Sequence, residues 1–127
     1  MKYFIPKPVA RTSSYEAGLS LYLNNNSGDY TLSLFLLFKK GNTQKITSDL
    51  LIQTTGSDGL KLKSYTSELI EMNGDFVATA IYILDGRDIT ALKKYNLKTL
   101  SFWFDSMIGL TVTENKDVLV KEFNCLN

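Results

Sequence analysis

Apolar side chains recur at every second position over much of this chain, and that period of two most constrains its fold. The alternation is clear at 19–23 and again at 30–38, on either side of the Asn-, Ser- and Gly-containing segment 24–29. Successive side chains of a β-strand point to opposite faces of the sheet, so each run predicts a half-buried strand. The two runs and the turn between them predict a β-hairpin.

The alternation continues in shorter runs further along the chain. Leu50 and Ile52 predict a short strand, and Leu60 and Leu62 predict another after a Gly-containing turn. Lysines fill the alternate positions of this second run, at 61 and 63. Charged side chains that alternate outward are typical of an edge strand protected against pairing with other chains.

Three predicted strands are apolar on both faces, at 30–38, 76–84 and 98–105. A strand of this kind is usually central in its sheet and covered on both sides. We therefore expect these strands to be interior, with a second sheet, helices or a partner chain as the cover.

Two short helices are expected. Residues 88–95 carry an apolar stripe, acidic residues at the start and lysines at the end, which match the helix dipole. Residues 116–126 also fit an amphipathic helix, although 118–120 would equally fit a strand. The prediction is a mainly β, α+β chain: an antiparallel β-sandwich of about seven or eight strands with two short helices. Residues 1–14 read as an extended arm and 15–127 as a single β-rich domain.

From about residue 78 to residue 126 the expected order is strand, short helix, two strands and an amphipathic end. The residues that carry this order are Ala80 to Leu84, Asp88, Ile89 and Leu92, Leu97 to Phe102, and Phe123 to Leu126. The pattern resembles the C-terminal part of small uncharacterised proteins of Bacteroidetes bacteria. It is also distantly similar to the β-sandwich with two helices of the invasion-associated locus B type. The resemblance implies a fold and a bacterial source but no activity.

Whole classes of chemistry lack their usual residues. The chain contains no histidine, and Cys125 is its single cysteine. The commonest general base, the usual zinc ligand and any Cys-cluster metal site are therefore missing. We identify no catalytic residues, no metal site and no cofactor site, and we expect Cys125 to be a small core residue. An enzyme is not expected, although carboxylates remain available as acid or base.

Charge and hydropathy give little sign of nucleic acid or membrane. Fourteen basic and thirteen acidic residues leave a net charge of +1, and the only arginines are Arg11 and Arg87. Nucleic acid recognition favours a basic surface with arginine, so no nucleic-acid partner is expected. No apolar run approaches the length of a membrane span. As written, the chain predicts a cytoplasmic protein, or an exported one if a leader was trimmed, as the locus B resemblance would imply.

One polar corner is a candidate ligand site. Asp85, Arg87 and Asp88 lie between a predicted buried strand and a predicted helix. Arg87 would suit a carboxylate or phosphate ligand at the helix N-terminus. The simpler interpretation is helix capping, because Asp85 and Asp88 have the spacing of a capping box.

An aromatic set is the candidate interaction surface: Phe35, Tyr65 and Trp103 lie on the less regular faces of their strands. Such residues are usually buried. The functional alternative is an exposed patch that binds a protein or sugar partner. The leading hypothesis is a non-enzymatic binding or interaction protein with a protein partner or self-association. The alternatives are a small-ligand-binding protein or cofactor-independent enzyme that uses the Asp85–Asp88 corner, and a structural subunit of a larger assembly docked through residues 1–14.

Overall fold

The computed structural model describes residues 2–3, 6–24, 26–38, 44–56, 59–72 and 74–126. These residues form nine strands and two helices. The strands are β1 (Lys2–Tyr3), β2 (Lys7–Arg11), β3 (Tyr15–Asn24), β4 (Asp29–Phe38), β5 (Thr47–Thr54), β6 (Leu60–Met72), β7 (Asp75–Ile83), β8 (Leu97–Trp103) and β9 (Met107–Thr111). The helices are α1 (Gly86–Lys94) and α2 (Val118–Leu126).

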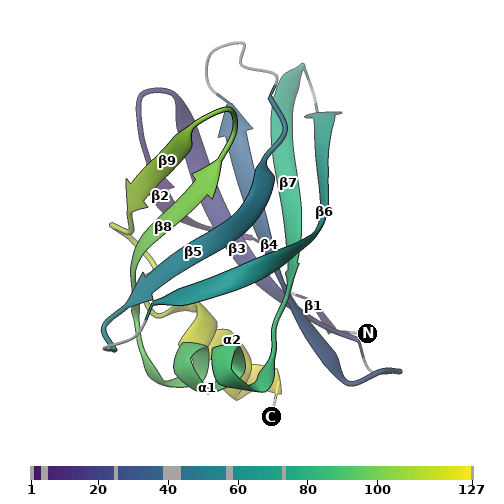
Figure 1. Cartoon of the computed structure of the whole chain (residues 1–127), viewed down its shortest axis with the longest axis vertical. Coiled ribbons are helices and arrows are strands. Elements are labelled where there is room, and N and C mark those ends of the chain that lie inside the picture. Colours follow the sequence, from purple (N-terminus) through teal and green to yellow (C-terminus); the bar gives the residue numbers. More distant parts are fainter. Residues whose placement is uncertain are drawn as a thin grey trace.

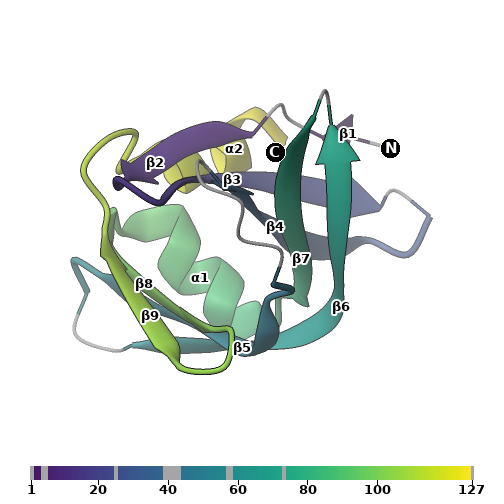
Figure 2. The same ribbon diagram turned by 90° about the horizontal axis from the view of Figure 1, so that it is seen from above.

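All described strands belong to one antiparallel sheet in the order β1-β3-β4-β7-β6-β5-β8-β9, with β2 also paired to β3. The sheet curls until it is nearly a barrel (Figures 1 and 2). The predicted class, mainly β with two short helices, is confirmed. A β-sandwich has two separate sheets. In this chain the two layers are halves of a single sheet, and the long, bent β6 joins them.

The prediction of an edge strand around residues 60–63 is wrong. This segment begins β6, which is internal to the sheet: residues 60–62 pair with β5, and the pairing with β7 begins at Lys63. Lys61 and Lys63 do point outward, and both are exposed. Their alternation therefore marks the outward face at the start of an internal strand, where residues 60–62 pair with β5 alone.

The two ends of the sheet meet along a seam between β2 and the segment that follows β9. The carbonyl oxygen of Val9 accepts hydrogen bonds from the backbone N–H groups of Thr113 (2.9 Å) and Glu114 (3.3 Å). Arg11 and Glu114 add a charged contact, with Nε and Oε2 2.8 Å apart. This hydrogen bond from Arg11 holds the pKa of the Glu114 carboxyl below its usual value. Residues 7–11, expected as part of an extended arm, are thus extended but built into the sheet.

The core fills the interior of the curled sheet, and the helices close one end of it. Fully buried side chains come from both halves of the sheet and from both helices, among them Leu34, Leu62, Phe102, Leu92 and Phe123. Figure 1 shows α1 and α2 below the strands, and Figure 2 shows α1 across the end of the barrel. The helical alternative for residues 116–126 is confirmed by α2. No helix in the part of the chain that the structure describes is long and apolar enough to cross a membrane.

The three strands with two apolar faces are central, as predicted, but they are not covered on both sides. β4, β7 and β8 each pair with two neighbours. Their inner faces are buried, whereas their outer faces keep partly exposed side chains such as Phe35, Ile81 and Trp103. The helices cover the end of the barrel rather than its wall. The outer face of the sheet is therefore partly open to solvent.

Candidate functional site

A hollow of about 390 Å³ lies on the outer face of the sheet over β3, β4, β7 and β6. We call it the outer groove. Apolar side chains from β3, β6 and β7 line it together with polar side chains from the β3–β4 hairpin. Its lining residues are Tyr22, Asn24, Ser27, Asp29, Thr31, Ser33, Tyr65, Ile81 and Ile83.

The register of three strands brings these residues side by side. Tyr22 on β3 is paired with Thr31 on β4, and Thr31 is paired in turn with Ile83 on β7. One step along, Ser33 is paired with Ile81. Directly paired residues share a face of the sheet, with Cβ atoms roughly 5 Å apart. The groove therefore follows from antiparallel register rather than from any contiguous motif.

Tyr65 reaches the groove because of a β-bulge. The pairing of β6 with β7 shifts between Ser64 and Thr66, which leaves Tyr65 as the extra residue of β6. An extra residue bends its strand and re-aims a side chain. Tyr65 consequently stands on the outer face with 66% of its surface exposed, beside Ile83 at 48%. These are two of the three large apolar side chains exposed in the described chain, Met107 being the third.

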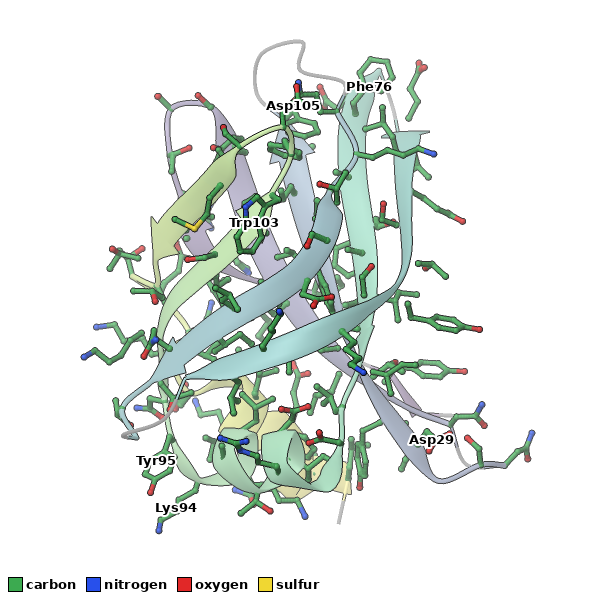
Figure 3. All side chains as sticks on the ribbon, viewed as in Figure 1. Asp29, Phe76, Lys94, Tyr95, Trp103 and Asp105 are labelled. Carbon is green, nitrogen blue, oxygen red and sulfur yellow. The ribbon has the colours of Figure 1, made fainter. Side chains whose placement is uncertain are left out.

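The polar side chains of the groove are largely uncommitted. Within the described residues, neither the carboxylate of Asp29 nor the hydroxyl groups of Thr31 and Ser33 bond to another protein group. Figure 3 shows Asp29 near the end of the β3–β4 hairpin. None of the nine lining residues is a lysine or an arginine. The groove therefore presents free oxygen atoms and a single negative charge.

The polar corner at 85–88 is a capping box. The Asp85 side chain accepts the Asp88 backbone N–H at 2.9 Å, and the Asp88 side chain accepts the Asp85 backbone N–H at 3.1 Å. The bond from the Asp88 N–H lowers the pKa of the Asp85 carboxyl, whereas burial raises the pKa of the Asp88 carboxyl. Arg87 is exposed. Both carboxylates are therefore occupied in starting α1.

The aromatic residues singled out from sequence lie in three different places. Tyr65 lines the outer groove. Phe35 lines a smaller hollow of about 120 Å³ on the same face of the sheet, together with Pro6 and Pro8. Trp103 lies on β8, paired with the exposed Met107 on β9 (Figure 3). Of these three aromatic residues, only Tyr65 lies in a groove with polar side chains that make no hydrogen bond or ion pair to other described residues.

Two residues that matter were missed from sequence. Tyr22 lies at an outward position of β3 opposite its leucine face, where it reads as ordinary surface. Glu122 is only 4% exposed although it is charged. The sequence did indicate that Glu122 would be buried. It lies three residues after Leu119 and four before Leu126, on the apolar stripe of α2. Cys125, expected in the core, is instead exposed, so that prediction is wrong.

No cluster of three or more His, Cys, Asp or Glu side chains in the described residues could hold a metal ion. Comparisons with known proteins found no matching family model, no similar curated protein and no similar solved structure.

Proposed function

We propose that this protein is a non-enzymatic binding protein whose outer groove takes a neutral saccharide. One observation carries the proposal: two tyrosine rings, Tyr22 and Tyr65, share a groove with the uncommitted side chains of Asp29, Thr31 and Ser33. Ligand pockets typically combine apolar and aromatic walls with a few free polar groups that orient the ligand.

Saccharide chemistry matches this combination. A pyranose ring has an apolar face of C–H groups, which packs on an aromatic ring, and an edge of hydroxyl groups. The Asp29 carboxylate accepts hydrogen bonds from such hydroxyls, and the Thr31 and Ser33 hydroxyls both donate and accept. A phosphate or carboxylate ligand would instead meet the negative charge of Asp29 with no lysine or arginine in the lining. A neutral ligand is therefore favoured over an anionic one.

The exposed apolar surface suits a small ligand better than a protein. A stable protein interface buries about 800 Å² on each partner around an apolar centre. Here only Tyr65 and Ile83 are large, apolar and exposed in the groove, and their described neighbours are polar or half-buried. A groove of about 390 Å³ lies within the usual range for small-molecule sites. Self-association through this face is therefore an outcome for the experiment to test.

The groove also suits binding rather than cleavage. Glycoside hydrolysis generally uses two carboxyl groups on either side of the scissile bond. Asp29 is the single carboxylic acid among the lining residues, and the chain has no histidine to serve as the partner acid or base. The nearest functional analogy is therefore a saccharide-binding module.

The test is titration of ¹⁵N-labelled protein with soluble neutral oligosaccharides, namely β-1,4-glucan, β-1,4-xylan and α-1,4-glucan fragments. Saturable shifts of the amide signals of β3, β4 and β7 around the groove are expected. Loss of a stacking ring is worth about 1 kcal/mol, so Tyr65→Ala should weaken binding about five- to tenfold. Tyr65→Phe keeps the ring and should retain most of the affinity.

Met107→Ala is the matched control, because Met107 is exposed to a similar degree but lies outside the groove. It should leave binding unchanged. The proposal fails if none of the oligosaccharides shifts the groove signals. It also fails if sedimentation reveals a dimer that Tyr65→Ala dissociates, because the groove would then be an interface between copies of the chain.

A further inference from the structure

A second hollow, of about 220 Å³, lies between β2 and α2, and we call it the helix-side pocket. Its lining residues are Lys7, Asn115, Asp117, Val118, Lys121, Glu122 and Cys125. It shares no residue with the outer groove. Most of its side chains are polar, and one of them, Glu122, is buried.

Only one of the two carboxylate oxygens of Glu122 has a hydrogen-bond partner among the described groups. One carboxylate oxygen, Oε1, accepts the backbone N–H of Leu21 at 2.9 Å. The other, Oε2, is buried without a hydrogen-bond partner among the described groups. A buried charged oxygen left unpaired is costly, so buried carboxylates normally have a donor or cation for each oxygen. Glu122 lines the pocket, so a donor that enters it lies close to a carboxylate with one buried acceptor unused.

The charges at the pocket mouth are complementary to Glu122. Lys121 is committed to Asp117, with Nζ and Oδ2 3.3 Å apart. Lys7 is exposed and belongs to none of the ion pairs found among the described residues. The pocket therefore offers one buried negative acceptor and one lysine that acts on it only at a distance and forms no ion pair among the described residues.

We infer that the helix-side pocket binds a small zwitterion of the free amino acid class, with its ammonium group on Glu122 and its carboxylate at Lys7. An ammonium group supplies the charge-assisted donor that the second oxygen of Glu122 lacks. The carboxylate of the same molecule meets the free lysine. A volume of about 220 Å³ is below the usual range for drug-sized ligands and excludes a long chain.

Cys125 provides the readout, because it lines the same pocket and its side chain is exposed. The rate of its alkylation by iodoacetamide is measured by mass spectrometry in the presence of glycine, L-serine, methylammonium or acetate. Glycine and L-serine should slow alkylation in a saturable manner within concentrations of about 10 mM. Methylammonium and acetate, which each carry one of the two charges, should need at least about tenfold higher concentrations for the same protection. Glutathione is the control thiol, whose alkylation none of the four should change.

Two variants test the assigned contacts. Glu122→Gln keeps the shape and the acceptor for Leu21 but removes the charge, and it should raise the half-protecting concentration at least about tenfold. Lys7→Met should do the same for the zwitterions but not for methylammonium, and it changes an exposed side chain. Lys98→Met, at an exposed lysine of β8, is the matched control. The inference is overturned if no probe protects Cys125, if acetate or methylammonium protects as well as glycine, or if Lys7→Met matches wild type. Tyr65→Ala should leave this protection intact, which separates it from the outer groove.

Discussion

Glu122 on α2 accepts a hydrogen bond from the backbone N–H of Leu21 on β3, 101 residues earlier in the chain. Leu21 lies on β3 between the stretch that pairs with β2 and the stretch that pairs with β1. The pairing with β2 reaches Leu19, and the pairing with β1 begins at Tyr22. The carboxylate therefore occupies a position where a neighbouring strand would otherwise supply the acceptor, and it fixes where α2 docks on the sheet.

Substitutions at Glu122 should separate hydrogen bonding from charge. Glu122→Leu leaves the Leu21 N–H buried without an acceptor, so we expect a loss of about 1–3 kcal/mol in the free energy of unfolding. Glu122→Gln keeps an acceptor and removes a buried charge, so it should be close to neutral. Urea denaturation of the three proteins at pH 7 measures both effects. Equal stability of the Leu and Gln variants would contradict the assigned hydrogen bond.

Stability should depend on pH through Glu122. Burial raises the pKa of its carboxyl above the usual 4.5, and the positive charge of Lys7 offsets part of this rise. Between 4.5 and the raised pKa the folded protein binds more protons than the unfolded chain, so the contribution of Glu122 is greatest at low pH and is lost as pH rises. The Tm of wild type relative to Glu122→Gln should therefore fall as pH rises from 4 to 8. A difference in Tm that is constant with pH would contradict this.

Much of the fold was predictable because strand periodicity reports burial directly. The β3–β4 hairpin, the long β7 and both helices follow from local patterns that the structure confirms. The closure of the sheet did not follow. The same outward lysines suit an edge strand or an internal one, and the choice depends on β6 pairing with both β5 and β7. Closure of the sheet depends on β5 pairing with β8 across 43 or more residues.

The candidate sites were harder to predict than the fold, for a physical reason. Tyr22 and Tyr65 line the same groove because of strand register and a one-residue bulge, and neither feature leaves a contiguous signature in the sequence. The contiguous polar cluster, Asp85 to Asp88, was conspicuous because helix capping is itself a local interaction. Residues that organise the backbone locally are therefore easier to predict from sequence than residues that could bind a ligand.

The capping box gives a direct test at the start of α1. Asp85→Ala removes the acceptor for the Asp88 N–H and should lower the Tm by a few degrees. Because hydrogen bonding lowers the pKa of Asp85, this contribution should fade as the pH falls below its usual value of 3.8. Arg87→Ala, at the exposed neighbour, is the control and should leave the Tm unchanged. A larger loss for Arg87→Ala than for Asp85→Ala would point to a role beyond capping.

Tyr82 should behave as a buried phenol without a hydrogen-bond partner. Its hydroxyl is buried with none among the described groups, and its side chain is fully buried. Burial raises its pKa well above the usual 10. Tyr82→Phe should therefore leave the protein equally stable or stabilise it by up to about 1 kcal/mol. Absorbance at alkaline pH should show fewer tyrosines ionising in the folded wild type than in the unfolded chain, and a smaller deficit in Tyr82→Phe. Marked destabilisation of Tyr82→Phe would show that the hydroxyl has a partner.

Deletion of residues 1–11 tests whether the N-terminal segment belongs to the barrel. It would remove β1 and β2, take the fully buried Val9 from the core and remove the carbonyl that accepts Thr113 and Glu114. It would also leave the long β3 as an open edge, which is prone to pair with other chains. We expect aggregation on size-exclusion chromatography and loss of the cooperative unfolding transition. Arg11→Ala, which breaks only an exposed ion pair, is the control and should unfold like wild type. A truncated chain that stays monomeric with an unchanged Tm would instead make the segment a dispensable arm, free to dock elsewhere.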